Sequence, residues 1–292
     1  MLPGYRKWSI IFLLPSGLFL IFAYVYPMVY SFIMSFFSYS MLIPGAKPVF
    51  TGINNYLSIF NNLAFLNSLR ITFIFSIVAI FFQFIIGLFL ALVMSANLRI
   101  TGVFRVFMFI PLMIAPVVVG ILWRNLYHAS YGVINFFISF LGIPPQIWLG
   151  SAKQALPAVI VVEIWQQLPV FAFILAAGIA SIPTELNKAA LVDGCGRMRI
   201  FWHITLPLLK PAIIVAFLLR IIDTLRMFDI VYTMTQGGPG TATKFLSLQI
   251  YEKGLRFFDI GNAAAQSWFF LIIVLLIEIY FIRLILRRGT AR

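Results

Sequence analysis

Six apolar runs divide the chain, and polar or basic segments separate them. Each run is long enough to supply the roughly 20 apolar residues that a helix needs to cross a bilayer. The pattern therefore predicts an all-α, polytopic membrane protein with about six transmembrane helices. The runs cover approximately residues 10–35, 69–94, 103–127, 156–180, 212–234 and 263–286.

The composition agrees with a chain that folds in lipid. It is 62% apolar and 10% charged, whereas soluble domains are about 45–50% apolar and about 25% charged. The net charge of +13 does not indicate nucleic-acid binding, because the basic residues lie between and beside the apolar runs. Cys195 is the single cysteine and the two histidines lie far apart, so the sequence predicts no disulfide and no metal site.

The distribution of Lys and Arg predicts the orientation of the helices. These residues are more frequent in the segments on the side of the two chain ends than in those on the opposite side. The positive-inside rule then places both termini in the cytoplasm. Three segments are expected outside, at about 36–68, 128–155 and 235–262, and two inside, at about 96–102 and 181–211.

The inner segment at 181–211, here called the coupling segment, is polar and basic between two apolar runs. Leu186, Ala189 and Ala190 are spaced i, i+3 and i+4, which places them on one face of a short helix. Gly194 permits a sharp turn after that helix, and a second helical stretch follows. A short helix–turn–helix held at both ends by membrane spans could transmit the movement of a soluble partner to those spans.

Several motifs resemble the membrane subunits of binding-protein-dependent ABC importers, in the carbohydrate-uptake class that includes the maltose and glycerol-phosphate permeases. The coupling segment resembles their cytoplasmic "EAA" loop, which contacts a separate ATPase. The coupling segment matches that loop at Ile182-Pro183, Leu186, Ala189-Ala190, Asp193-Gly194 and Ile204-x-Leu206-Pro207. Further matches elsewhere are Thr51-Gly52, Asn55-Tyr56, Phe228-Asp229 and Thr235-x-Gly237-Gly238-Pro239.

Two residues of the coupling segment depart from the family pattern. Lys188 stands where the family usually has Glu, and Cys195 stands where it usually has Ala. Lys188 reverses a charge at the expected ATPase-docking surface. The resemblance implies the following residues for ATPase coupling: Glu185, Leu186, Lys188, Ala189, Ala190, Asp193, Gly194 and Gly196.

The resemblance implies a type I ABC importer permease fold in a prokaryotic inner membrane. It divides the chain into a first helix and outer loop at 1–68, a core at 69–286, and a cytoplasmic tail at 287–292. The implied partners are a second homologous permease in a heterodimer, two ABC ATPase subunits and an external solute-binding protein. The chain is not expected to be an enzyme or to bind a cofactor, because ATP and Mg²⁺ would be bound by the partner ATPases.

One loop resembles a nucleotide-binding motif but lacks its required residues, which agrees with ATP binding by a separate subunit. Residues 237–244 resemble a phosphate-binding loop, but Thr243 precedes Lys244 and Phe245 follows it. A Walker A motif needs Gly before the Lys, and Ser or Thr after it. The energy for transport is therefore expected to come from another subunit.

Charged residues inside the predicted spans are candidates for function, since intramembrane charges are costly and usually face a partner or a water-filled cavity. From their estimated depths, Glu163 is expected near Arg226, and Glu278 near Arg220. Asp223 joins the intramembrane charge set of Arg220 and Glu278. Sugars are bound by planar polar groups and stacked aromatic rings, and the expected pathway residues are Glu163, Trp165, Gln166, Gln167, Arg226, Asp229, Tyr232 and Trp268.

The function that these observations favour is import of a sugar or related polyol by alternating access, driven by partner ATPases. An alternative stays open from the residues alone. Asp223, Asp229 or Glu163 could form the ion or proton site of a secondary transporter that needs no ATPase. Six spans without an internal repeat disfavour this alternative.

Overall fold

The computed structural model describes residues 4–95 and 101–289, and helices dominate these residues. A two-stranded antiparallel hairpin pairs Phe37 with Phe50. The elements are α1 (Gly4–Leu20), η1 (Ile21–Val25), α2 (Tyr26–Met34), β1 (Phe37–Ser38), β2 (Val49–Phe50), α3 (Asn54–Asn61), α4 (Leu63–Ser95), α5 (Thr101–Met113), α6 (Pro116–Leu126), α7 (Val133–Ser139), α8 (Ala155–Ala180), α9 (Thr184–Val192), α10 (Arg197–Ile200), η2 (Phe201–Thr205), α11 (Leu206–Leu225), α12 (Asp229–Met234), α13 (Leu246–Tyr251), η3 (Glu252–Arg256) and α14 (Ile260–Gly289).

The described residues contain five helices that are long and apolar enough to cross a membrane, or six if one bent pair counts as a span. The expected all-α membrane fold is therefore confirmed. Residues 96–100 of the short inner loop and 290–292 of the expected tail lie outside the described residues. The candidate spans are Phe12–Met34, Leu63–Ser95, Ala155–Ala180, Arg197–Leu225 and Ile260–Leu284, with Arg105–Met113 plus Pro116–Leu126 as the bent pair.

The third apolar run is not the single helix that hydropathy predicted. It consists of α5 and α6, which meet at an angle of 99°. Pro116 is the first residue of α6 and Ala115 before it is extended, with φ −59° and ψ 138°. A residue before proline is driven out of the helical region by the proline ring, so the chain turns at this point without losing its apolar character.

The fifth apolar run also differs from its prediction. The run at 212–234 consists of two helices, because α11 ends at Leu225 and α12 starts at Asp229. At the N-terminal end the helix starts earlier than predicted, since α10, η2 and α11 continue one another from Arg197. Arg226 is therefore the C-terminal cap of α11 and not an interior residue of a span.

The described chain divides into two compact units. The first unit consists of residues 1–66 and 249–273, and the second of residues 67–248 and 274–292. In the first unit, the buried Asn55 donates to the carbonyl oxygens of Ser35 and Phe37, both at 2.9 Å. These bonds fix the start of α3 against the end of α2 and the hairpin.

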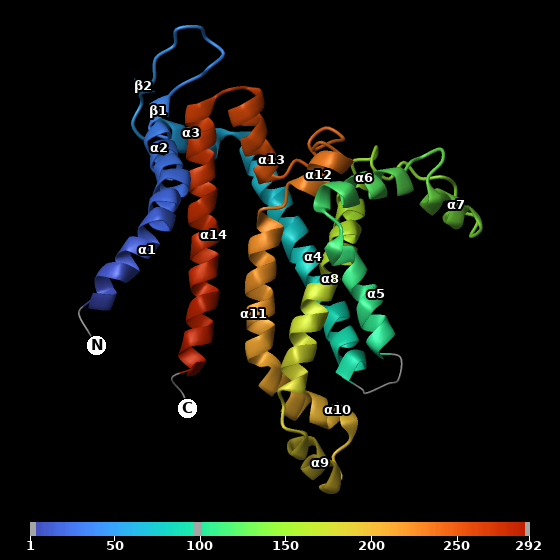
Figure 1. The fold of residues 1–292 in the computed structure, drawn as a ribbon. Coiled ribbons are helices and arrows are strands. Elements are labelled where there is room, and N and C mark those ends of the chain that lie inside the picture. The colour runs from blue at the N-terminus through green and yellow to red at the C-terminus, as the bar shows by residue number, and fades with distance from the viewer. Residues whose placement is uncertain (1–3, 96–100, 290–292) are drawn as a thin grey trace. The chain divides into compact units, whose positions relative to one another are not determined.

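The core of the second unit lies where α4, α8 and α11 pack side by side (Figure 1). Gly178 on α8 brings this helix close to α11. A Cβ atom at Gly178 would lie 2.6 Å from the Cβ of Ala212, so only glycine fits this approach. The coupling segment lies at one end of these helices, and α6 and α12 lie at the other end (Figure 1). The buried apolar residues of this core are Ile80, Ala91, Phe171, Leu175, Leu209 and Ala216.

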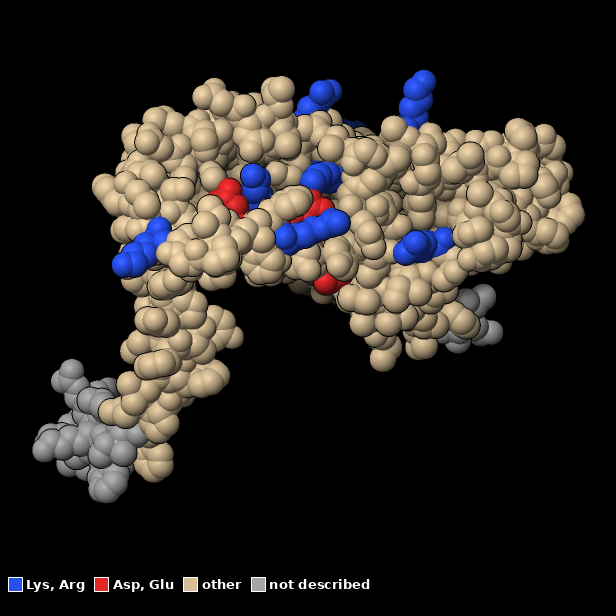
Figure 2. All heavy atoms as spheres, turned by 90° about the horizontal axis from the view of Figure 1, so that it is seen from above, with Lys and Arg blue, Asp and Glu red and all other residues tan. Residues whose placement is uncertain are grey.

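Charged side chains are sparse at the end of the molecule that carries α6 and α12. Figure 2 shows a largely uncharged surface there with a few basic and acidic side chains. This agrees with the low charged fraction of 10% in the sequence.

Candidate substrate pathway and coupling segment

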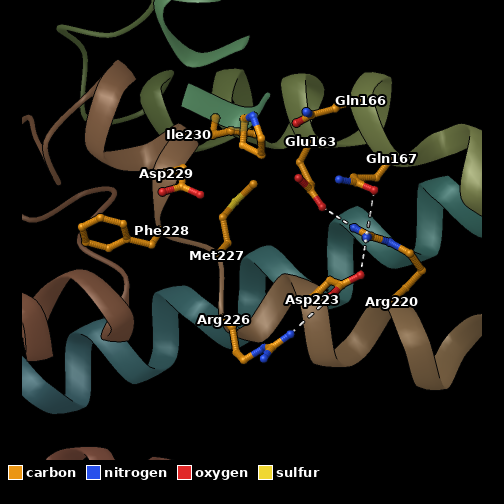
Figure 3. Close-up of a pocket in the computed structure, with 11 residues that line it drawn as sticks. Glu163, Gln166, Gln167, Arg220, Asp223, Arg226, Met227, Phe228, Asp229 and Ile230 are labelled. Carbon is orange, nitrogen blue, oxygen red and sulfur yellow. Dashed lines mark hydrogen bonds and ion pairs between the residues drawn. The ribbon is translucent and has the colours of Figure 1, made fainter. Parts of the chain in front are cut away.

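The second unit contains a polar pocket of about 480 Å³ between α6, α8, α11 and α12 (Figure 3). Acidic, basic and amide side chains gather in it, together with a few apolar ones. Such a mixture inside an otherwise apolar bundle is the usual mark of a ligand site. The residues that line this polar pocket are Pro116, Glu163, Gln166, Gln167, Arg220, Asp223, Arg226, Met227, Phe228, Asp229 and Ile230.

Arg220 on α11 lines the polar pocket, and its side chain is fully buried. Its Nη2 donates to Glu163 Oε1 in a buried ion pair. Its Nη1 donates to Gln167 Oε1 at 3.2 Å and to Asp223 Oδ2 at 3.3 Å. A buried charge is tolerated only with such partners, because leaving water costs several kcal/mol per ion.

Gln83 on α4 completes this arrangement, and reasoning from the sequence missed it. Its side chain is fully buried. Gln83 Oε1 accepts from Arg220 Nε at 3.2 Å, and its Nε2 donates to the backbone oxygen of Glu163 at 3.2 Å. One amide thus links three helices. The available signal was the position of Gln83 as a lone polar side chain within a long apolar stretch of α4.

The two expected intramembrane pairs are wrong. Glu163 pairs with Arg220 rather than with Arg226. Arg226 instead lies 3.6 Å from Asp223 Oδ1, with 66% of its side chain exposed. The error arose because the depth of each charge was estimated from a helix that ends at Leu225, before Arg226. Among the described residues, Arg220 forms its ion pairs with Glu163 and Asp223, and none is found between it and the half-buried Glu278.

Five of the expected pathway residues line the polar pocket: Glu163, Gln166, Gln167, Arg226 and Asp229. The three expected aromatic residues do not. Trp165 packs against Trp123 with ring centroids 5.4 Å apart, and Tyr232 stacks on Phe228 at 5.3 Å. Trp268 belongs to the first unit, where it packs against Phe32 at 4.9 Å. Phe228 is the aromatic residue that lines the pocket, and sequence reasoning used it only as a family motif.

The coupling segment forms the expected helix–turn–helix. Pro183 caps α9, and Gly194 makes the turn after it with φ +76°. Cys195 donates its backbone N–H to the carbonyl of Ala190 at 2.9 Å, which closes the end of α9. Ala190 is buried, whereas Leu186 and Ala189 are exposed, so the expected common face is only partly packed.

The exposed surface of the coupling segment carries several large apolar side chains. Val192 is 88% exposed and Met198 is 70% exposed. The expected coupling residues Glu185, Lys188, Asp193, Gly194 and Gly196 are exposed as well. Exposed apolar patches of this kind mark interaction sites. The large apolar side chains exposed on the segment are Leu186, Leu191, Val192, Met198, Trp202 and Leu208.

Comparison with known proteins decides the family. Residues 83–291 match the family described as the binding-protein-dependent transport system inner membrane component. The chain belongs to this family. The importer permease expected from the sequence is therefore confirmed, and the secondary-transporter alternative gains no support. The match begins at Gln83 and includes every residue of the polar pocket.

Two relatives match most of this permease. The trehalose/maltose transport system permease protein MalF of Thermococcus litoralis is 39% identical over 228 residues, which are 78% of this chain and 77% of the relative. The sulfoquinovosyl glycerol transport system permease protein SmoG of Agrobacterium fabrum is 34% identical over 274 residues, 91% of this chain and 89% of the relative. Both similarities extend well outside the coupling segment.

A solved structure shows the same fold. The permease superimposes with a TM-score of 0.84 on a chain of a bacterial ABC transporter involved in the import of the acidic polysaccharide alginate. The match covers 97% of this chain and 96% of that chain, at 24% sequence identity. The type I importer permease fold expected from the sequence is thus confirmed.

Proposed function

We propose that this permease carries a sugar or related polyol through the membrane by alternating access, and that partner ATPases drive the movement. The polar pocket is the site through which the solute passes. The coupling segment is the surface on which an ATPase docks. The family membership supports the importer, and the arrangement of the two sites along common helices supports the mechanism.

The observation that carries the proposal is the continuity between the coupling segment and the pocket. Three residues separate the end of α8 at Ala180 from the start of α9 at Thr184. At the other end of the coupling segment, α10 continues through η2 into α11. Glu163 lies about 26 Å along α8 from that end, and Arg220 lies about 21 Å along α11 from Leu206, at about 1.5 Å of rise per residue. A displacement of α9 and α10 would therefore be transmitted through two continuous helices to the walls of the pocket.

The solute class rests on the chemistry of the pocket and on the relatives. Carboxylates and amides in a cavity can form hydrogen bonds with the hydroxyl edges of a sugar, and an aromatic ring can contact its apolar face. The polar pocket offers both, with Phe228 as the ring. The names of the two relatives refer to trehalose or maltose and to a sulfonated glycoside of glycerol.

The proposed assembly follows from the family. A second homologous permease would form a heterodimer with this chain, two ATPase subunits would bind ATP and Mg²⁺, and an external binding protein would deliver the solute. The protein would lie in a prokaryotic inner membrane with both termini in the cytoplasm. The basic coupling segment then faces the cytoplasm, as the positive-inside rule requires.

Co-expression with the neighbouring transporter genes tests the proposal. We expect the tagged chain to co-purify with an ATPase, and we expect solute-loaded binding protein to stimulate ATP hydrolysis in proteoliposomes. Uptake should stop when ATP is replaced by a non-hydrolysable analogue. Uptake that continues without ATP and depends on an imposed ion gradient would contradict the proposal and support an ion-coupled secondary transporter instead.

A further inference from the structure

We propose that the polar pocket selects an uncharged, polyhydroxylated solute and disfavours an anionic one. Gln166 and Asp229 would accept hydrogen bonds from the hydroxyl groups of the solute. This inference rests on the proposed function, because it names the chemical class of the solute at the same site. The carbohydrate relatives include both neutral and anionic solutes in their names, so the distinction has to come from this chain's own pocket.

Gln166 on α8 presents an acceptor without a donor. Its side chain is 1% exposed, and its Nε2 donates to the carbonyl of Ile114 at 3.1 Å. That bond fixes the orientation of the amide, because only the nitrogen can donate. The remaining oxygen, Oε1, is buried and has no hydrogen-bond partner among the described residues. An unpaired buried acceptor costs free energy, and a hydroxyl group entering the pocket would supply the missing donor.

Asp229 supplies a second acceptor at the start of α12. Figure 3 shows its carboxylate directed toward the middle of the pocket. It forms no ion pair within the described part of the chain. The hydroxyl of Thr233 donates to the backbone oxygens of Asp229 and Ile230, not to the Asp229 carboxylate. Both carboxylate oxygens can therefore accept from a solute.

The two guanidinium groups of the pocket both have carboxylate partners, but only Arg220 is buried among them. Arg220 donates to Glu163, Asp223, Gln167 and Gln83, so an anionic solute could bind it only by breaking these bonds. Arg226 lies 3.6 Å from the second oxygen of Asp223. Arg220 is therefore not free to receive a phosphate, sulfonate or carboxylate group, whereas Arg226 is exposed and has only this one ion pair among the described residues.

The charge of the pocket also opposes an anion. Its lining contains three carboxylates, on Glu163, Asp223 and Asp229, against the two guanidinium groups. Of these three, Asp229 is the carboxylate that has no ion pair among the described residues. A cationic solute would meet the exposed Arg226 in the same cavity. A hydroxyl group, which carries no charge and can donate to each acceptor, fits the pocket best.

Solute binding to the complete importer, purified without its binding protein, tests the inference. Omitting the binding protein removes its own selectivity from the measurement. Saturation-transfer NMR would compare trehalose, glucose 6-phosphate and glucosamine at one ionic strength. We expect trehalose to bind at least about tenfold more tightly than glucose 6-phosphate, since two charges about 6 Å apart at an effective dielectric of about 40 give a factor near ten.

Two variants assign the selectivity to named side chains. Asp229 is exposed, so Asp229→Asn should not disturb the core. This variant should reduce the ratio of the affinity for trehalose to that for glucose 6-phosphate by at least about threefold. Gln166→Met should weaken trehalose binding by about tenfold, because it removes the acceptor at nearly constant volume. Asp259→Asn is the matched control, as its carboxylate lies in the first unit, 3.8 Å from Lys253.

The outcomes separate this inference from the proposed function. Equal or tighter binding of glucose 6-phosphate or glucosamine, no binding of any of the three, or an unchanged preference in Asp229→Asn would overturn the inference. ATP-driven uptake with binding-protein stimulation could still hold in each of these cases. Loss of that stimulation in the unaltered importer would instead overturn the proposed function.

Discussion

At the scale of single residues, the unusual feature of this permease is a fully buried arginine in a membrane helix. Arg220 is stabilised because each of its three side-chain nitrogens donates to an acceptor, from α4, α8 or its own helix. Buried ion pairs add little stability compared with well-packed apolar residues, yet removing one partner leaves an uncompensated charge. Removing one member of the ion pair should therefore destabilise the protein more than replacing both members with apolar residues.

Arg220→Ala should destabilise the second unit by about 3–5 kcal/mol, because Glu163 is left buried without its counter-ion. The double variant Arg220→Met with Glu163→Met should be less destabilising than Arg220→Ala alone, since it leaves no unpaired charge. The thermal unfolding midpoint of the detergent-solubilised importer measures both.

Arg226→Ala is the matched control for this experiment. Its side chain is 66% exposed, and exposed ion pairs contribute only about 0–1 kcal/mol. If Arg220→Ala and Arg226→Ala lowered the midpoint equally, the buried pair would not have the structural role assigned to it.

At the scale of elements, the coupling segment depends on the turn between its two short helices. Gly194 adopts φ +76° and donates its N–H to the carbonyl of Leu191 at 3.1 Å. Proline can adopt neither this φ nor this hydrogen bond. Gly196, two residues later, has φ −69° and ψ 156°, a conformation that proline accepts.

Gly194→Pro should abolish transport and stimulation of the ATPase while leaving membrane insertion intact, because only the turn is disrupted. Gly196→Pro, the control, should retain most activity. The measurements are binding-protein-stimulated ATP hydrolysis and the yield of the membrane-inserted chain. Normal stimulation in Gly194→Pro would show that the geometry of this turn does not matter for coupling.

At the scale of the molecule, α8 and α11 connect the coupling segment with the polar pocket, and these two helices pack closely against each other. Gly178 permits this packing, since a Cβ there would lie 2.6 Å from Ala212 and 2.7 Å from Leu209 on α11. Packed helices transmit displacement because close-packed interiors resist compression.

Gly178→Ala should lower the unfolding midpoint and reduce the uptake obtained per ATP hydrolysed, since the added methyl group pushes α8 away from α11. Overpacking of this kind costs about 1–3 kcal/mol. Gly17→Ala in α1 is the control, because no atom lies within 4 Å of a Cβ built there. An equal effect of the two substitutions would mean that the α8–α11 approach is not needed.

The sequence by itself determined that the chain is a helical membrane protein, where most of its spans lie, and where the coupling segment begins and turns. These features depend on local properties: the apolar length of each run, and proline and glycine at fixed places. It also identified five residues of the polar pocket, because charged and amide side chains are conspicuous in apolar helices.

Only the tertiary structure decided which of these side chains meet. The breaks before Pro116 and after Leu225 leave the hydropathy unchanged, yet they move Arg226 to a helix end and leave Arg220 opposite Glu163. Gln83 joins the pair from a helix 80 residues away in sequence from Glu163. Pairing inside a bundle depends on the rotation and depth of each helix, and packing between helices sets both.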